Sequence, residues 1–82
     1  MDKELFDLRS NKKKIVDYLF TSENKIKGFC DDCISGILNI RPRQQVNQIC
    51  HILEDEGIIS RVQFKCDLCK KVKILNFAEE NE

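Results

Sequence analysis

The part of the chain most informative about the fold covers residues 34–61 and reads ISGILNIRPRQQVNQICHILEDEGIISR. Its centre, from Pro42 to Glu56, predicts an amphipathic helix, because apolar residues recur three and four positions apart. The expected buried stripe consists of Val46, Ile49, Cys50 and Leu53. Pro42 suits the first helical position, where a missing N–H costs nothing, and Gly57 suits the C-cap. This segment is therefore expected to be a helix with well-defined ends.

A shorter helix is expected immediately upstream. Asp31 and Asp32 suit its first turn, where carboxylates meet the positive end of the helix macrodipole. Its apolar side is expected to consist of Cys33, Ile34, Ile37 and Leu38. Asn39-Ile40-Arg41 would then be the turn between the two helices. Arg41 would be the N-cap of the longer one, although Ser or Asp would suit that position better.

The N-terminal part of the chain predicts one more helix, over residues 3–21. Its apolar face would carry Leu5, Leu8, Ile15 and Leu19, and its lysines at 12–14 fall largely off that face. The alternative is a break at Ser10-Asn11 that divides this segment into two shorter helices. Residues 22–29 are expected to form a loop that can hold a short strand at 25–29.

A β-hairpin is expected after the glycine. Val62 and Phe64 on one side of its turn, and Val72 and Ile74 on the other, alternate with polar residues. The acidic tail, residues 78–82, is expected to be disordered. With 82 residues the chain is expected to form a single domain, 1–82.

The order of helix, short helix, turn, long helix, glycine and hairpin resembles that of the winged helix-turn-helix family of DNA-binding domains. The resemblance rests on residues 34–61, above all on LEDEGIISR at 53–61, which looks like the point where the family's recognition helix enters its wing. It covers roughly residues 3–77. It implies an α+β, mainly α fold of three helices and a β-hairpin wing. It implies less about function, because winged helices also serve as protein-interaction modules.

Two Cys-x-x-Cys pairs, Cys30/Cys33 and Cys66/Cys69, have the spacing of metal ligands. Two intervening residues let both sulfurs of a pair turn toward one ion, and two pairs complete the tetrahedron of soft ligands that zinc prefers. The resemblance implies that the pairs meet, because in that family the short strand before the second helix pairs with the last wing strand. We therefore expect one structural Zn²⁺ per chain, as an addition to the family pattern.

Other uses of the cysteines remain open from the sequence. They are one or two redox pairs, reduced thiols without metal, and an iron–sulfur cluster; no thioredoxin-like strand and helix surround either pair. A catalytic zinc is not expected, because four protein thiolates leave no open coordination position. Cys50 lies on the apolar stripe and is expected to be a small buried hydrophobic residue.

The charged residues are unevenly distributed. The formal net charge is zero, which argues against a strong non-specific nucleic-acid binder. Residues 41–53 nevertheless contain two arginines and no acid, and residues 58–77 contain five basic residues and one acid. The acids collect at residues 54–56 and in the tail. Seven of the fourteen basic residues are thus grouped on one predicted helix and one predicted hairpin.

The helix predicted over 42–56 has a polar face that suits base recognition. This face, roughly opposite the buried stripe, carries Gln44, Asn47, Gln48 and His51. Amide side chains can read adenine edges, and Arg41 and Arg43 can reach phosphates or guanine. The wing residues expected along flanking phosphates are Arg61, Lys65, Lys70, Lys71 and Lys73. His51 is expected to be solvated or to face a phosphate rather than to bind metal.

These features favour a zinc-stabilised winged-helix protein that binds double-stranded DNA, as a small transcriptional regulator or an accessory DNA-binding module. The alternative is a winged-helix protein-interaction module without DNA binding, which the zero net charge and the acidic patches favour. An enzyme with a small-molecule substrate is not expected, because no catalytic set of residues is present. A homodimer is compatible with the sequence. No apolar run suits a membrane span and no signal peptide opens the chain, so a cytoplasmic, reducing location is expected.

Overall fold

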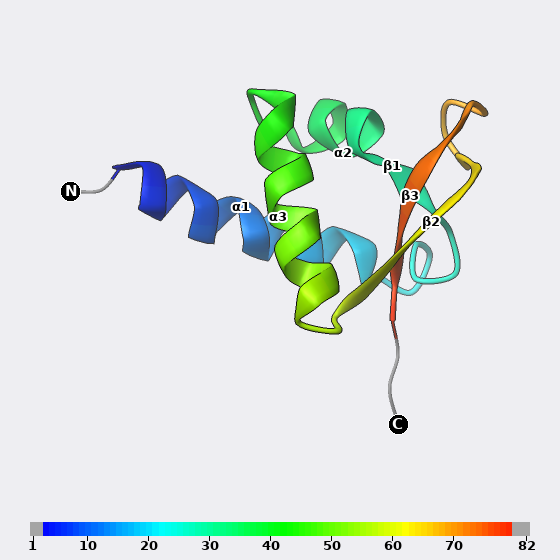
Figure 1. The fold of residues 1–82 in the computed structure, drawn as a ribbon, viewed down its shortest axis with the longest axis horizontal. Coiled ribbons are helices and arrows are strands. Elements are labelled where there is room, and N and C mark those ends of the chain that lie inside the picture. Colours follow the sequence, from blue (N-terminus) through cyan, green and yellow to red (C-terminus); the bar gives the residue numbers. More distant parts are fainter. Residues whose placement is uncertain (1–2, 80–82) are drawn as a thin grey trace.

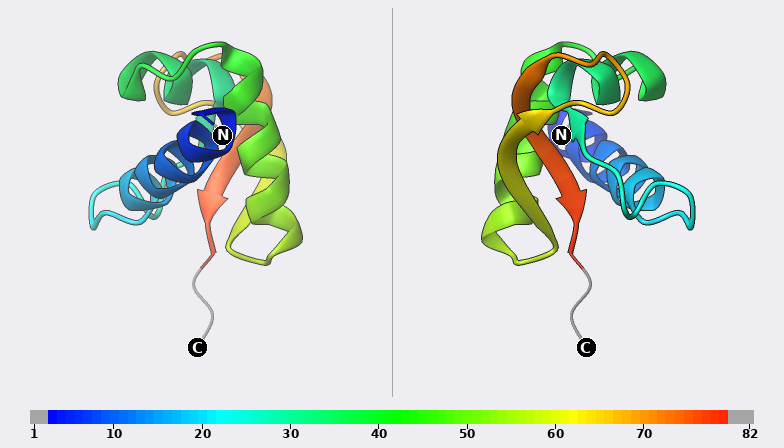
Figure 2. Two further views of the ribbon diagram at one scale, coloured as in Figure 1. Left: turned by 90° about the vertical axis from the view of Figure 1, so that its left-hand side faces the viewer. Right: turned by 90° about the vertical axis from the view of Figure 1, so that its right-hand side faces the viewer.

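The computed structural model describes residues 3–79, with side chains from Arg9 onward. In that range the chain forms three helices and a three-stranded sheet (Figure 1). The elements are α1 (Lys3–Leu19), β1 (Phe29–Cys30), α2 (Asp31–Leu38), α3 (Arg43–Asp55), β2 (Ile59–Lys65) and β3 (Val72–Ala78). The helices lie together on one side of the molecule and the sheet on the other (Figures 1 and 2). The order of helices and strands is the predicted one.

The sheet is antiparallel and has the strand order β1-β3-β2. β2 and β3 form the predicted hairpin, in which Ser60 lies opposite Phe77 and Lys65 lies opposite Val72. β1 pairs with the other edge of β3, with Cys30 opposite Leu75. β1 has only two residues, shorter than the strand expected at 25–29, and it leads directly into α2. The start of α2 is therefore attached to the middle of β3.

The core lies between the helices and the hairpin. The predicted stripe of α3 is buried, and it packs in one cluster with residues of α1, α2, β1 and β2, notably Ile15, Leu19, Phe29, Ile34 and Ile59. The rings of Tyr18 and Phe29 contact each other with centroids 5.4 Å apart. Leu5 and Leu8, predicted on the same face of α1, lie outside the described side chains.

The ends of α3 follow from local chemistry, with one correction. Pro42, not Arg41, is the N-cap, since its φ of −74° and ψ of 165° are extended and the helix begins one residue later. Gly57 has a φ of 77°, which favours glycine, and the N–H groups of Gly57 and Ile58 donate to the carbonyls of Glu54 and Leu53. These two bonds form a Schellman motif, which ends the helix where the glycine predicted it.

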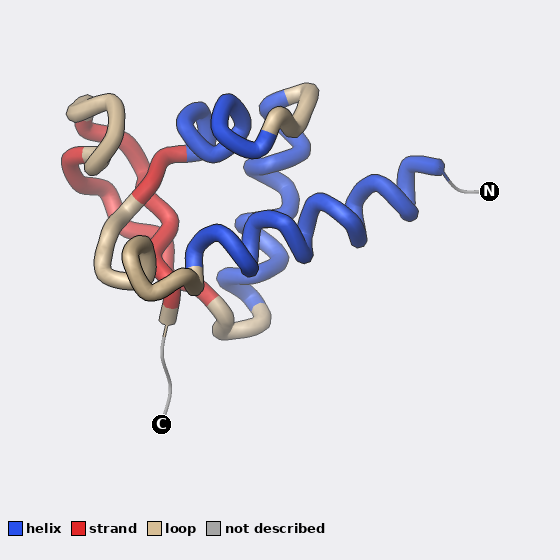
Figure 3. Tube along the Cα trace, turned by 180° about the vertical axis from the view of Figure 1, so that it is seen from behind, coloured by secondary structure: helices blue, strands red, loops and turns tan. Residues whose placement is uncertain are grey.

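Other predictions needed adjustment. α1 is continuous through Ser10-Asn11 and extends beyond the rest of the molecule at its N-terminal end (Figure 3). Ile37, predicted on the buried side of α2, is 47% exposed, whereas Ile34 is buried. The acidic tail is partly ordered: Ala78 ends β3 and the N–H of Glu79 donates to the carbonyl of Ile58 at 3.1 Å. Residues 80–82 lie outside the described part of the chain.

The far end of the hairpin exposes apolar side chains on both faces. Val62, Phe64, Val72 and Ile74 are 51–65% exposed. They alternate along the strands as predicted, but they do not join the helical core. Directly opposed residues of an antiparallel pair share a face, so Val62 lies on the face of Leu75, and Ile74 lies on the opposite one.

Candidate metal centre

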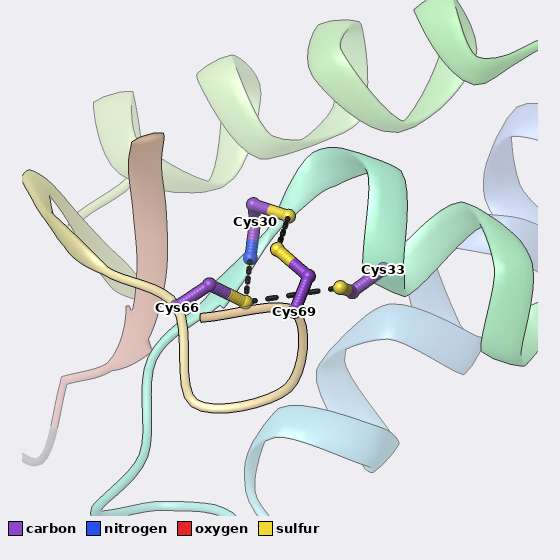
Figure 4. A group of neighbouring side chains, drawn as sticks. All are labelled: Cys30, Cys33, Cys66 and Cys69. Atoms are coloured by element: carbon purple, nitrogen blue, oxygen red, sulfur yellow. Dashed lines mark hydrogen bonds between the residues drawn. The ribbon is translucent and has the colours of Figure 1, made fainter. Parts of the chain in front are cut away.

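The two Cys-x-x-Cys pairs meet in one cluster of sulfurs (Figure 4). Cys30 ends β1 and precedes α2, Cys33 lies in the first turn of α2, and Cys66 and Cys69 lie in the turn between β2 and β3. All four sulfurs lie within 4.8 Å of one another. The predicted meeting of the pairs is confirmed, and these four residues could together hold a metal ion.

The spacing of the sulfurs suits a tetrahedral ion. Cys30 Sγ lies 3.8 Å from Cys69 Sγ, and Cys66 Sγ lies 3.7 Å from Cys33 Sγ. A tetrahedral ion about 2.3 Å from each of four sulfurs would place those sulfurs about 3.8 Å apart. A disulfide needs about 2.05 Å between its sulfurs, so the cysteines are reduced.

Backbone and side-chain hydrogen bonds hold the second pair beside the first. Within the turn, Cys66 N–H donates to the carbonyl of Lys71 at 2.9 Å, and Lys70 N–H donates to that of Cys66 at 3.0 Å. Between the two segments, Asp67 N–H donates to the carbonyl of Gly28 at 3.1 Å. Gly28 N–H in turn donates to Asp67 Oδ2 at 2.8 Å. Asp67 thus ties the turn to the residue before β1.

The electrostatics of the cluster favour binding of a cation. Burial raises the pKa of Cys66, but backbone N–H groups of Cys69, Cys30 and Leu68 outweigh it and lower that pKa to about 6. The N–H of Cys30 lies 3.5 Å from Cys66 Sγ. Burial and neighbouring sulfurs raise the pKa of Cys33, and burial raises that of Cys30. One thiolate therefore forms readily, and a cation is needed to hold several in this small volume.

Gly28 supplies the close packing behind the cluster. A Cβ at this position would lie 2.3 Å from Phe77 Cζ and 2.9 Å from Leu75 Cδ1. Leu75 and Phe77 pack with Cys30 and Cys66 in a small cluster separate from the helical core. A side chain at residue 28 would therefore push β1 away from β3, where the first cysteine pair begins.

We expect Gly28→Ala to lower the free energy of unfolding of the metal-loaded protein by about 1–3 kcal/mol, the usual cost of overpacking. Gly36→Ala is the matched control, because a Cβ there meets nothing within 4 Å. As a helical position, residue 36 should gain up to about 1 kcal/mol from alanine. Urea unfolding of both variants measures the difference; equal stabilities would show that the packing at residue 28 is not tight.

A buried polar network lies next to the cluster and includes two predicted DNA contacts. Asp31 accepts hydrogen bonds from Asn47 Nδ2 at 3.0 Å and from Asn76 Nδ2 at 2.8 Å. Arg61 lies against the same carboxylate at 3.4 Å, and its Nη1 donates to Asn76 Oδ1 at 2.8 Å. Asn76 Nδ2 also donates to the carbonyl of Phe29 at 2.9 Å. The network connects β1, α2, α3, β2 and β3.

This network corrects the predicted role of Arg61. Its side chain is only 6% exposed and its guanidinium is held by Asp31 and Asn76, so it cannot lie along a flanking phosphate. Asn47 is half-buried with its amide N–H engaged by Asp31, which makes it a poorer base-edge residue than its neighbours on α3. The signal that sequence reasoning missed is Asn76, a polar residue between apolar neighbours in the strand.

The other predicted DNA-binding residues form two groups. Arg43 and Lys73 both bind Asp32, a residue that sequence reasoning placed only in the first turn of a helix. The exposed residues with no ion pair in the described part of the chain are Arg41, Gln44, Gln48, His51, Lys65, Lys70 and Lys71. His51 is not part of the cysteine cluster.

Cys50 is the one cysteine outside the cluster. It is buried in the helical core as predicted, and burial raises its pKa to about 12. It is therefore a thiol in contact with apolar side chains, not a metal ligand.

Comparisons with family models, curated proteins and solved structures found no significant match to this chain. None of the helices in residues 3–79 is both long and apolar enough to cross a membrane.

Proposed function

We propose that the four clustered cysteines bind one zinc ion, which stabilises the fold. Four thiolates at tetrahedral spacing are the donor set of structural zinc sites. They fill the coordination shell, so the ion would supply folding free energy rather than an open catalytic position. An iron–sulfur cluster is less well supported, because its cysteines bind different iron atoms and must stand further apart than ligands of a single ion.

We propose further that the domain is a winged helix-turn-helix that binds double-stranded DNA, as a small transcriptional regulator or accessory module. The order of elements and the strand order β1-β3-β2 support the family assignment. In this proposal α3 enters the major groove and the β2–β3 hairpin is the wing. Arg43 of α3 and Lys73 of β3 bind the same carboxylate, so the first turn of α3 lies beside the hairpin.

The observation that carries the DNA proposal is the exposed face of α3. Gln44, Gln48 and His51 are exposed there, with no acidic residue between Arg41 and Leu53. Uncharged amides can read base edges when positive charge is supplied elsewhere. The lysines at 65, 70 and 71, exposed around the hairpin turn, would supply it through phosphate contacts, which orient a protein on DNA without specifying sequence.

A salt titration tests this proposal. We expect zinc-loaded protein to bind duplex DNA, with log K falling linearly against log salt by about 0.9 for each phosphate contacted, because counterions are released. Replacing Lys65, Lys70 and Lys71 by Gln should weaken binding to all sequences and flatten that slope. Gln48→Ala should instead change sequence preference and leave the slope unchanged.

The charge-matched control replaces Lys13, Lys14 and Lys27, exposed lysines elsewhere on the surface, by Gln. If this control lowers the affinity as much as the hairpin variant, the hairpin is not a specific contact. If wild-type protein shows no affinity at low salt, the DNA proposal is wrong.

One observation favours the alternative, a protein-interaction module. Val62, Phe64, Val72 and Ile74 expose apolar surface at the end of the hairpin, and phosphate contacts do not need such side chains. A partner protein that covers the hairpin would account for them. Failure of the salt titration would make this the preferred function.

A further inference from the structure

Asp32 binds two cations that come from different parts of the chain. Its Oδ1 accepts a hydrogen bond from Arg43 Nε, at the start of α3. Its Oδ2 accepts one from Lys73 Nζ, in β3, at 2.6 Å. Each oxygen of this one carboxylate is thus taken by a different cation. The geometry shows that Arg43 and Lys73 converge on a single anionic group.

A hollow of about 220 Å³ lies next to this contact. Its walls come from α2, α3 and the hairpin, and they include Arg43, Lys73, Arg61 and Asp31. Arg61 and Asp31 neutralise each other in the buried network. Arg43 and Lys73 carry two positive charges and share one ion-pair partner, Asp32, so that carboxylate neutralises only one of them. Cys30 of the cysteine cluster also lines the hollow, and the sulfurs of Cys30 and Cys69 favour the charged form of Lys73.

We infer that Arg43 and Lys73 form a binding site for one phosphate group, and that Asp32 occupies this site when no ligand is bound. A phosphodiester presents two charged oxygens on one centre, as a carboxylate does, and both arginine and lysine bind it by charge-assisted hydrogen bonds. The inference rests on the proposed function for its ligand, a phosphate of the DNA backbone that lies between α3 and the hairpin.

Asp32 can leave the site at small cost. Its side chain is 43% exposed, so its carboxylate can turn into water, and exposed ion pairs are weak. It nevertheless remains close to an incoming phosphate and repels it. Asp32 therefore lowers the affinity for phosphate groups, and its removal frees two cations at once.

The test compares Asp32→Asn with Asp17→Asn. Asp17 is the matched control because it is an exposed aspartate paired with Lys13 on α1, away from the hollow. We expect Asp32→Asn to raise DNA affinity about fivefold and to steepen the salt dependence by about one phosphate contact, with little change in the control. Asp32 lies between Cys30 and Cys33, so the metal content of the variant must stay at one ion per chain. If Asn disturbs the metal site, Asp32→Ser provides a second test of the same change in charge.

A second pair of variants tests whether Arg43 and Lys73 bind the phosphate. When Arg43→Gln or Lys73→Gln is added to Asp32→Asn, the gain in DNA affinity should disappear. A gain that persists without these cations, or an equal gain in Asp17→Asn, would overturn the inference, because it would then reflect net charge alone.

Inorganic phosphate separates this inference from the DNA proposal. If neither wild type nor Asp32→Asn binds duplex DNA at low salt, the proposed function fails. The site itself is still supported if phosphate, at the ionic strength of a chloride control, raises the melting temperature of Asp32→Asn and not that of Asp32→Asn/Arg43→Gln. The phosphate group that occupies the site would then belong to a phosphorylated molecule other than DNA. If duplex DNA does not bind and phosphate does not stabilise Asp32→Asn either, the phosphate site is wrong as well.

Discussion

Replacing Cys66 by Ser is expected to abolish metal binding at the proposed zinc site and to remove the cooperative thermal transition of the domain. Cys66 is fully buried, and its sulfur lies 3.7 Å from that of Cys33 across the cluster. A hydroxyl is a poor substitute for a thiolate toward a soft-ligand ion, and three remaining ligands leave the shell open. Structural zinc is worth about 10–16 kcal/mol of apparent binding free energy in small peptides, more than most small domains have in total.

Native mass spectrometry and circular dichroism on heating measure this result. We expect one metal ion per wild-type chain and none in Cys66→Ser, whose signal should decay without a sharp midpoint. Treating wild type with a chelator should reproduce the change. Cys50→Ala is the matched control: it also removes a buried sulfur, but from the helical core, so the metal should stay bound. Wild-type protein that is metal-free and melts at the same temperature as the variant would disprove the site.

The physical reason for this dependence is the separation of the two apolar clusters. The helical core contains residues from α1, α2, α3, β1 and β2, but none of the four clustered cysteines. The other cluster has only Cys30, Cys66 and Leu75 as fully buried members. So small a cluster buries little apolar surface, and the proposed ion would supply the stability that the hydrophobic effect cannot provide there. Without metal, we expect the turn at 66–71 and the adjoining part of β3 to separate from β1 first, and the helical core then to lose the packing of Phe29 in β1 and Ile59 in β2.

Asp31→Ala is expected to lower the free energy of unfolding by about 3–5 kcal/mol, because it leaves a buried guanidinium without its counter-charge. Asp31 and Arg61 are 5% and 6% exposed, and the carboxylate also accepts hydrogen bonds from Asn47 and Asn76. Urea unfolding of metal-loaded protein measures the loss. Removing both charges, in Asp31→Leu/Arg61→Met, should restore much of the lost free energy of unfolding, because a buried charge pair stabilises a fold little more than apolar packing does.

Asp32→Ala is the control for this prediction. It removes the same charge from the neighbouring residue, within the same Cys-x-x-Cys pair, but its ion pairs with Arg43 and Lys73 are exposed. Such pairs contribute about 1 kcal/mol or less. If both substitutions have the same effect, the network around Asp31 does not stabilise the fold beyond an ordinary surface contact.

Local chemistry accounts for the elements that the sequence predicts well. Val46, Ile49, Cys50 and Leu53 recur at helical spacing and are all buried, and Gly57 ends the helix by adopting a left-handed backbone. Alternation of apolar and polar residues marked the hairpin. The Cys-x-x-Cys spacing identified the four cysteines of the candidate metal site, because two sulfurs of one pair can face one ion whatever the rest of the chain does.

The assignment of individual polar side chains could not be predicted in this way. Arg61 and Lys73 look equivalent in the sequence, as basic residues of one hairpin. Arg61 turns inward toward Asp31, whereas Lys73 lies on the rim and pairs with Asp32. Which face of a strand meets the core depends on the register with β3 and on where the helices pack, and both are long-range properties.

The helices, the hairpin and the two cysteine pairs could be recognised in the sequence, because each depends on residues close together in the chain. The three-dimensional fold was needed to show that Asp31, Asn47, Arg61 and Asn76 form one buried network and that Asp32 joins Arg43 to Lys73. The reason is that these buried hydrogen bonds and ion pairs join residues far apart in the chain, such as Asp31 and Asn76 at a separation of 45 positions, which no local pattern records.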